Sequence, residues 1–151
     1  MERIKVIALF GPSGAGKDTI QRWMLKKIPN SHKIILHTTR PKRKYEKENQ
    51  DYHFVSTDDF LDLMDNKRII DCTIFNEWFY GIDINEFVKG KINIGVFNPQ
   101  SIRQLIMNQS HKFNILPVWI QSHDKQRLLR NLKSIICLDL LELQYFQKMQ
   151  E

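Results

Sequence analysis

Cysteine and long apolar runs are the two features that this sequence has least of. It contains 2 cysteines in 151 residues, Cys72 and Cys137, which lie far apart and lack the spacing of metal ligands. We therefore expect neither a disulfide framework nor a zinc site. Both cysteines are interpreted as buried thiols of a protein in a reducing compartment.

No apolar run is long enough to cross a membrane, and no repeat or low-complexity segment is present. The sequence begins Met1-Glu2-Arg3 and continues directly into a strand-like run, so we expect neither a signal peptide nor a membrane partner. These absences favour a cytoplasmic protein of one domain. The net charge of +6 favours anionic partners, either nucleic acid or the phosphates of nucleotides.

What the sequence does contain is a glycine-rich segment, residues 11–19, between an apolar run and a helical pattern. Its two outer glycines and the lysine that follows have the spacing of a phosphate-binding loop. Glycine permits backbone conformations in which successive N–H groups surround phosphate oxygens, and the positive end of the next helix faces the same anion. The lysine can reach the β- and γ-phosphates. The residues predicted to bind ATP phosphates are Gly11, Ser13, Gly14, Ala15, Gly16, Lys17, Asp18 and Thr19.

One residue of this loop departs from the usual pattern. Asp18 stands where a serine or threonine usually supplies a hydroxyl to Mg²⁺. A carboxylate beside polyphosphate is repelled unless a cation lies between them, so Asp18 could hold Mg²⁺ directly or through water. The alternative is an acidic first-turn residue that interacts favourably with the helix dipole. The sequence leaves both interpretations open.

Strand-like and helical segments alternate along most of the chain. Apolar runs predict strands at 6–10, 33–37, 92–97 and 113–120, and helical patterns cover 18–27, 98–107, 124–133 and 138–149. This alternation predicts an α/β fold, a P-loop NTPase-type parallel sheet flanked by helices. We expect a core of residues 1–37 and 91–151, with a short lid at about 124–137. The last helix is expected to pack on the sheet, with a role as an interaction helix as the alternative.

The middle of the chain, about 38–90, is polar and charged and then carries short strand-like pieces. We expect strands at 52–55, 69–75 and 79–82, and a helix at 57–65 with Thr57 as its cap. This part is interpreted as an inserted substrate-binding subdomain at the carboxyl edge of the sheet, where such folds bind their ligands.

The inserted part begins with a basic run that carries Arg40 and Arg43. Two guanidinium groups on one loop can bind a phosphate with a planar, bidentate geometry that lysine cannot match. Composition alone would favour a solvated loop or a nucleic-acid patch.

The arrangement around the two arginines resembles the nucleoside-monophosphate-binding segment of the guanylate kinases. That family follows its phosphate loop with Thr-Thr-Arg, a second arginine, a glutamate, an Asp-Tyr-x-Phe-Val run, an acidic residue and a Tyr-Gly pair. The resemblance extends from about residue 4 to 132. The residues that match in register are Thr38, Thr39, Arg40, Arg43, Glu46, Asp51, Tyr52, Phe54, Val55, Asp71, Tyr80 and Gly81.

The resemblance implies a monophosphate-binding site formed by Arg40, Arg43, Tyr52, Asp71, Tyr80 and Asn98. The arginines and tyrosines would hold the acceptor phosphate, and the Asp71 and Asn98 side chains would contact the base. Three positions depart from the family: Leu36 and Ile82 replace base-contacting serines, and Val96 replaces an aspartate. We therefore expect an apolar base pocket lined by Leu36 and Ile82. Such a pocket favours a pyrimidine or a broad range of deoxynucleotides over strict selection of guanine. In this respect the chain is similar to viral and bacterial deoxynucleoside-monophosphate kinases.

These observations predict a nucleoside monophosphate kinase that uses ATP and Mg²⁺, with Lys17, Arg127 and Arg130 as the catalytic cations. The alternative is a catalytically weak or inactive nucleotide-binding or interaction module derived from that family. A reduced lid, Val96 and the expected absence of the family's last strand favour this alternative. Nucleic acid is not an expected partner, because no aromatic stacking platform or recognition-helix pattern accompanies the basic run. The oligomeric state is left open, a homodimer included.

Overall fold

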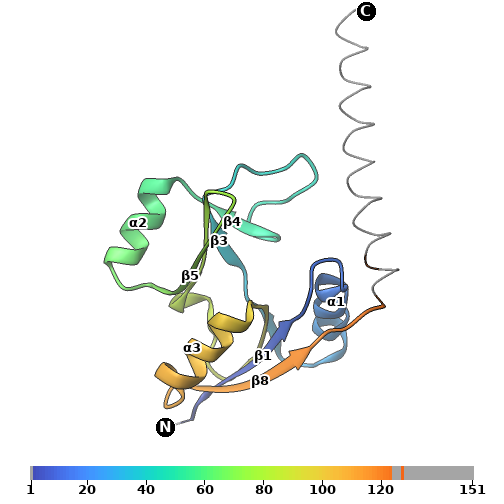
Figure 1. The fold of residues 1–151 in the computed structure, drawn as a ribbon. Helices are drawn as coiled ribbons and strands as arrows, with labels where there is room; N and C mark the ends of the chain where they lie inside the picture. The colour runs from blue at the N-terminus through green and yellow to red at the C-terminus, as the bar shows by residue number, and fades with distance from the viewer. Residues whose placement is uncertain (1, 124–126, 128–151) are drawn as a thin grey trace, which may run out of the picture.

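The computed structural model describes residues 2–123 and residue 127 (Figure 1). In these ranges the elements are β1 (Ile4–Phe10), α1 (Lys17–Lys27), β2 (Ser31–Lys33), β3 (Leu36–Thr38), β4 (Tyr52–Phe54), α2 (Thr57–Asp65), β5 (Ile69–Phe75), β6 (Trp78–Asp83), the 3₁₀ turn η1 (Ile84–Glu86), β7 (Ile92–Val96), α3 (Pro99–Gln109) and β8 (Phe113–Trp119).

The core sheet has the strand order β2-β7-β1-β8, and all of its pairings are parallel. This confirms the predicted α/β fold with a parallel sheet. The buried apolar cluster draws on β1, β8 and α3, on Ile82 of β6, and on residues of the segments that connect the strands. Its members are Val6, Ala8, Ile34, Ile82, Phe87, Phe97, Ile102, Leu105 and Phe113. The predicted Asn98 cap of α3 is confirmed, because its side chain accepts a hydrogen bond from the Ser101 N–H.

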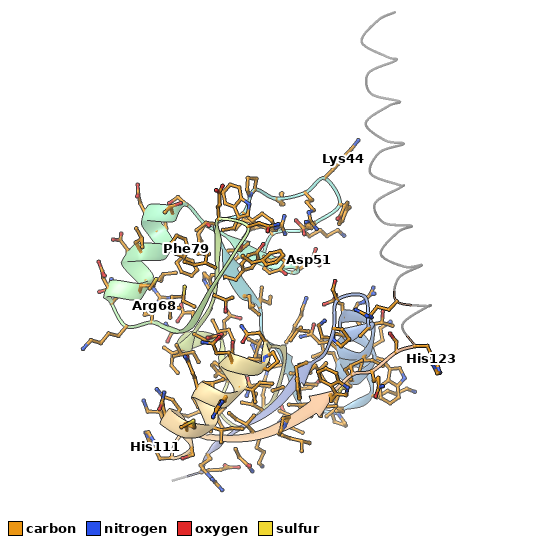
Figure 2. The ribbon with its side chains drawn as sticks, viewed as in Figure 1. Lys44, Asp51, Arg68, Phe79, His111 and His123 are labelled. Atoms are coloured by element: carbon orange, nitrogen blue, oxygen red, sulfur yellow. The ribbon has the colours of Figure 1, made fainter. Side chains whose placement is uncertain are left out.

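The second sheet lies above the core sheet in Figure 1 and has the order β4-β3-β6-β5. β3 and β4 are parallel, whereas β6 runs antiparallel to both β3 and β5. Helix α2 covers this sheet through Phe60, which is fully buried and stacks on Phe79 with ring centroids 5.4 Å apart. Figure 2 shows the labelled Phe79 between α2 and the strands. This sheet carries most of the residues that the sequence assigns to acceptor binding.

The structure differs from the sequence-based expectations at four places. The strand expected at 33–37 is two strands, β2 and β3, which belong to different sheets. The cap of α2 is Ser56, not Thr57, because the Ser56 hydroxyl accepts the Asp59 N–H. η1 was not expected. Cys72 is exposed, so the expectation of a buried thiol is wrong there: the side chain of this residue lies on the open face of β5.

Several expectations fall on residues outside the described ranges. They are Cys137, the helix at 138–149, and the helix and lid at 124–137 except for Arg127. Within the described part of the chain, no helix combines the length and the apolar character needed to cross a bilayer.

Candidate active site

The loop between β1 and α1 owes its path to its glycines. Gly11 has a φ of +150°, and a Cβ atom there would lie 2.2 Å from the Ile120 carbonyl oxygen at the end of β8. Gly14 and Gly16 have φ values of +74° and +94°, in the left-handed region that side chains disfavour. Gly16 directly precedes the first residue of α1. The loop therefore opens onto the N-terminal end of a helix, where backbone N–H groups have no intrahelical partner.

Lys17 spans this loop. Its ammonium donates hydrogen bonds to the carbonyl oxygens of Gly11 and Pro12, both at 2.9 Å. Burial lowers the pKa of this amine, and the neighbouring Asp18 carboxylate acts in the opposite direction. The carbonyl groups of the loop therefore hold the Lys17 ammonium in place.

The other predicted phosphate-binding residues differ in exposure. Ser13, Asp18 and Thr19 are exposed, whereas Ala15 is buried and its N–H donates to the Pro12 carbonyl at 3.2 Å. The exposed side chains and the helix N-terminus face open space, which is the arrangement that a polyphosphate requires.

Arg40 is held by a bidentate ion pair. Its two terminal nitrogens donate to the Glu46 carboxylate at 3.0 and 2.7 Å, and the side chains are 11% and 9% exposed. The guanidinium also lies over the rings of Tyr52 and Phe54, at 5.5 and 5.6 Å from their centroids. The hydrogen bond to Glu46 raises the pKa of Arg40. Burial opposes ionisation of Glu46, but the hydrogen bonds from Arg40 and the Arg43 backbone lower the pKa of this carboxylate.

The other members of the predicted phosphate clamp lie close to this ion pair. The backbone N–H of Arg43 donates to Glu46 at 2.8 Å, and its exposed side chain reaches the Tyr45 hydroxyl at 3.4 Å. The Tyr52 and Tyr80 rings meet edge to face with centroids 6.0 Å apart. Burial raises the pKa of the Tyr52 phenol, and the nearby Tyr80 and Asp18 raise it further. The structure thus brings Arg40, Arg43, Tyr52 and Tyr80 together.

A cavity of about 480 Å³ lies between α1 and this clamp. In Figure 2 the labelled Lys44 stands at the tip of the loop between β3 and β4 and points away, whereas the labelled Asp51 lies near the start of β4. The residues that line the cavity are Asp18, Gln21, Arg22, Lys33, Ile34, Leu36, Arg43, Tyr45, Glu46, Asp51, Tyr52 and Val96. Side chains from the phosphate-loop helix and from the acceptor clamp therefore share one cavity.

The two predicted base contacts lie elsewhere. The Ser101 hydroxyl donates to the Asp71 carboxylate, and the Asn98 amide donates to the Thr73 hydroxyl at 2.7 Å. Among the described residues, neither Asp71 nor Asn98 lines the cavity. Burial raises the pKa of Asp71, against the effect of the Ser101 hydrogen bond. The pocket expected between Leu36 and Ile82 is not formed, because Ile82 is 1% exposed and belongs to the core cluster.

Of the two lid arginines, Arg127 is described and Arg130 is not. The Arg127 N–H donates to the His123 carbonyl at 3.0 Å, and its side chain is half-buried.

Sequence reasoning assigned no role in the site to three residues that shape it. Glu46 positions Arg40, Ser101 binds Asp71, and Gln21 lines the cavity. Glu46 was within reach, because it stands in register in the arginine segment. Gln21 could have been noticed as a polar residue on the face of α1 that packs against the sheet. Ser101 gave no local signal, since its partner is distant in sequence.

The carboxylate of Asp18 fits a magnesium ion held between the loop and a nucleotide. It is exposed at the start of α1 and lines the cavity. Mg²⁺ usually takes one or two protein carboxylates and completes its shell with phosphate oxygens and water. In the described part of the chain, no group of three or more histidine, cysteine or carboxylate side chains could form a metal site without a substrate.

Comparison with known proteins links this geometry to a family. The family model described as guanylate kinase matches residues 3–140. A guanylate kinase of Schizosaccharomyces pombe is 35% identical over 85 residues, which are 54% of this chain and 41% of that protein. A guanylate kinase of Helicobacter pylori is 30% identical over 131 residues, 84% of this chain and 62% of that protein. The chain therefore spans roughly half the length of such relatives.

The chain is also similar to part of a longer protein and to a solved structure. The rat protein MAGUK p55 subfamily member 4 is 30% identical over 107 residues, 68% of this chain and 24% of that protein. The crystal structure of guanylate kinase from Anaplasma phagocytophilum has a TM-score of 0.64 at 24% identity, and the match covers 87% of this chain and 68% of that one. That likeness shows the fold. Because the family model matches most of the sequence, this chain belongs to the guanylate kinase family.

Proposed function

We propose that this protein is a nucleoside monophosphate kinase that transfers the γ-phosphoryl group of ATP to a nucleoside or deoxynucleoside monophosphate. An oxygen of the acceptor phosphate forms a bond to the γ-phosphorus. The bond from that phosphorus to the β–γ bridging oxygen breaks, and ADP leaves with the electron pair. Such a transfer depends on positioning and charge neutralisation more than on covalent chemistry.

The single observation that carries this proposal is the shared cavity. Asp18 enters it from the helix of the phosphate loop, and Arg43 and Tyr52 enter it from the acceptor clamp. A donor phosphate at the loop and an acceptor phosphate at the clamp would therefore meet in one space. This is the arrangement that in-line transfer requires.

The predicted site residues can divide the work. Lys17 would follow the charge of the transferring group, and Arg40, Arg43, Tyr52 and Tyr80 would orient the acceptor phosphate. Arg127 and Arg130 would neutralise charge from the lid side. Asp18 would hold Mg²⁺, and that ion would neutralise phosphate charge when bound. The ion pair with Glu46 supports this division, because it fixes the Arg40 guanidinium before any ligand arrives.

The base pocket of this kinase would differ from one that selects guanine strictly. The cavity wall includes the apolar side chains of Ile34, Leu36 and Val96. An unpaired polar group of a bound base costs about 1–3 kcal/mol, so an apolar wall disfavours a base with many polar edges. The expected preference is for a pyrimidine or for a broad set of deoxynucleotides.

A coupled assay of ADP release with each common nucleoside and deoxynucleoside monophosphate tests both parts of the proposal. We expect turnover with several acceptors and little ADP release without one. Binding of ATP and of monophosphates without turnover would instead identify an inactive nucleotide-binding module. If GMP and dGMP alone are phosphorylated, and Leu36→Ser does not improve their kcat/KM, the proposed base preference is wrong.

A further inference from the structure

The acceptor cavity contains one deeply buried amide whose role no resemblance assigns. Gln21 lies on α1, is 3% exposed and lines the cavity. It is one helical turn beyond Asp18, a rise of about 4.5 Å from the phosphate end. If a ligand places its phosphate near Asp18 and the clamp, the remaining lining residues, Gln21 among them, are left for its base.

The orientation of the Gln21 amide follows from its partner. Its Nε2 atom donates to the Ile94 carbonyl at 2.9 Å. Because a carbonyl can only accept, the NH₂ group must face Ile94 and the amide oxygen must take the other position. Among the described residues, no hydrogen bond to that oxygen accompanies the contact with Ile94. The oxygen is also not one of the buried atoms without a partner, so it is open to the cavity. The oxygen is therefore the polar atom that Gln21 offers to the cavity.

Apart from Asp18, which is assigned to Mg²⁺, the carboxylates around the cavity are already engaged. Glu46 accepts from Arg40 and Arg43, and Asp51 accepts the Lys47 N–H at 2.8 Å. Two apolar lining residues lie close to the contact of Gln21: the Ile34 N–H donates to the same Ile94 carbonyl, and Val96 follows Ile94 on β7. An acceptor beside apolar side chains favours a group that brings its own N–H donor.

The two base contacts expected from the family resemblance are engaged in a different task. Asp71 and Thr73 on β5 are hydrogen-bonded to Ser101 and Asn98 at the start of α3. These two bonds join the second sheet to the core. Asp71 keeps its second carboxylate oxygen and Asn98 the second N–H of its amide, but neither side chain lines the cavity.

We propose that Gln21 is the base-reading residue of the acceptor site, and that its amide oxygen accepts an N–H of a pyrimidine base. A pyrimidine has fewer polar edge atoms than a purine, so fewer would remain unpaired against the apolar walls. This inference rests on the proposed function, because it treats the cavity as the acceptor site.

Methylated acceptors test this contact in the wild-type protein. The probes are dTMP against N3-methyl-dTMP, and dCMP against N4,N4-dimethyl-dCMP, each bound in the calorimeter and assayed for turnover. We expect the methylated member of at least one pair to bind roughly 10- to 100-fold more weakly, as for a lost hydrogen bond to a buried acceptor. Equal affinity in both pairs would overturn the assignment.

The Gln21→Leu variant separates a lost hydrogen bond from a steric effect of the methyl group. If Gln21 reads the base, the ratio within the sensitive pair falls toward one in this variant, while ATP affinity is kept. A clash elsewhere would leave the ratio unchanged and would overturn the assignment. Gln104→Leu, the same substitution at an exposed position of α3, is the matched control and should keep the wild-type ratio.

The failure of this inference differs from the failure of the proposed function. Turnover of several acceptors with a binding ratio of one would keep the kinase and reject Gln21. A high ratio that depends on Gln21, without phosphoryl transfer to any acceptor, would keep the base contact and reject the kinase. Absence of monophosphate binding altogether would reject both. If Gln21→Leu does not fold, Gln21→Met takes its place, because it keeps the length of the side chain without the amide oxygen, and the ratio within the sensitive pair should again fall toward one.

Discussion

The phosphate loop and the acceptor clamp are suited to the same chemical group but are built in different ways. The loop is a contiguous segment between β1 and α1, and its shape comes from backbone conformation at three glycines. The clamp is assembled from side chains of the 40–46 loop, β4 and β6. A contiguous loop needs only its own residues and one strand end to hold its shape. The clamp depends on the packing of the whole second sheet.

This comparison predicts that a substitution that destabilises the second sheet should weaken monophosphate binding more than ATP binding. Phe60→Ala removes a fully buried ring that stacks on Phe79, and large-to-small changes of this kind cost about 3–5 kcal/mol. We expect the free energy of unfolding in urea to fall by that amount. Monophosphate binding should weaken more than ATP binding in calorimetry at low temperature.

The neighbouring residue supplies the control for this experiment. Leu61→Ala removes a side chain that is 42% exposed on the same helix, and should change stability by less than about 1 kcal/mol. Equal losses of ATP and monophosphate affinity in Phe60→Ala would show that the two regions depend on one another more than their construction implies.

The second prediction concerns the loop alone. Lys17→Ala removes the cation that hydrogen-bonds to Gly11 and Pro12, and turnover should fall about 100-fold or more, as for other positioned groups that stabilise developing charge. Monophosphate affinity should be kept, because the clamp does not include this residue. Lys26→Ala, in the exposed last turn of α1, is the matched control for loss of a lysine charge. Undiminished turnover in Lys17→Ala is the result that would reject the mechanism.

The third prediction is the converse for the clamp. Arg40→Ala should weaken monophosphate binding by about 1.5–3 kcal/mol, the scale of a charged hydrogen bond, with ATP affinity little changed. Arg40→Lys keeps the charge but loses the bidentate contact with Glu46, so it should recover only part of this affinity. Calorimetry with both ligands measures the difference.

Lys42→Ala is the control for Arg40, since Lys42 is exposed on the same loop. Equal weakening of ATP and monophosphate binding by Arg40→Ala would place this arginine outside the clamp. Strong DNA binding by the wild-type protein that is lost in Arg40→Ala would favour the nucleic-acid interpretation of the basic run.

The same contrast explains what the sequence could predict. The phosphate loop, helix α2 and strand β5 were predicted with nearly their observed bounds, because periodicity and turn residues are local signals. The apolar run at 33–37 was expected to be one strand. In the structure, the chain crosses there from one sheet to the other: the Ile34 N–H pairs with the Ile94 carbonyl and the Ile35 N–H with Glu86. No local pattern states which sheet a residue will join.

The candidate site shows the same limit. Arg40, Arg43, Tyr52 and Tyr80 were placed together by resemblance to a family, and spacing alone would have left them as a basic loop and two tyrosines. The partners of Asp71 and Asn98 could not be found in this way. The Asp71 contact joins residues 30 positions apart, one on β5 and one on α3, and depends on where α3 begins relative to β5. Such pairs are decided by tertiary packing.

The smallest predicted effect concerns that contact and depends on pH. Burial raises the pKa of Asp71 in the folded protein, so the folded state binds more protons than the unfolded state between the unfolded and the folded pKa. The wild-type protein therefore loses stability as pH rises through this window, and ionised Asp71 opposes folding at neutral pH. Asp71→Asn, which can still accept the Ser101 hydroxyl, should gain stability relative to the wild type over the same rise in pH. The gain should stay below about 1 kcal/mol, because solvent screens a partly exposed carboxylate.

Urea denaturation of both proteins from acid to neutral pH measures this gain in stability, with Asp62→Asn on α2 as the control for loss of one charge. A stability difference that shrinks as pH rises would mean that the Ser101 hydrogen bond outweighs burial, and that the contact between β5 and α3 favours the ionised carboxylate.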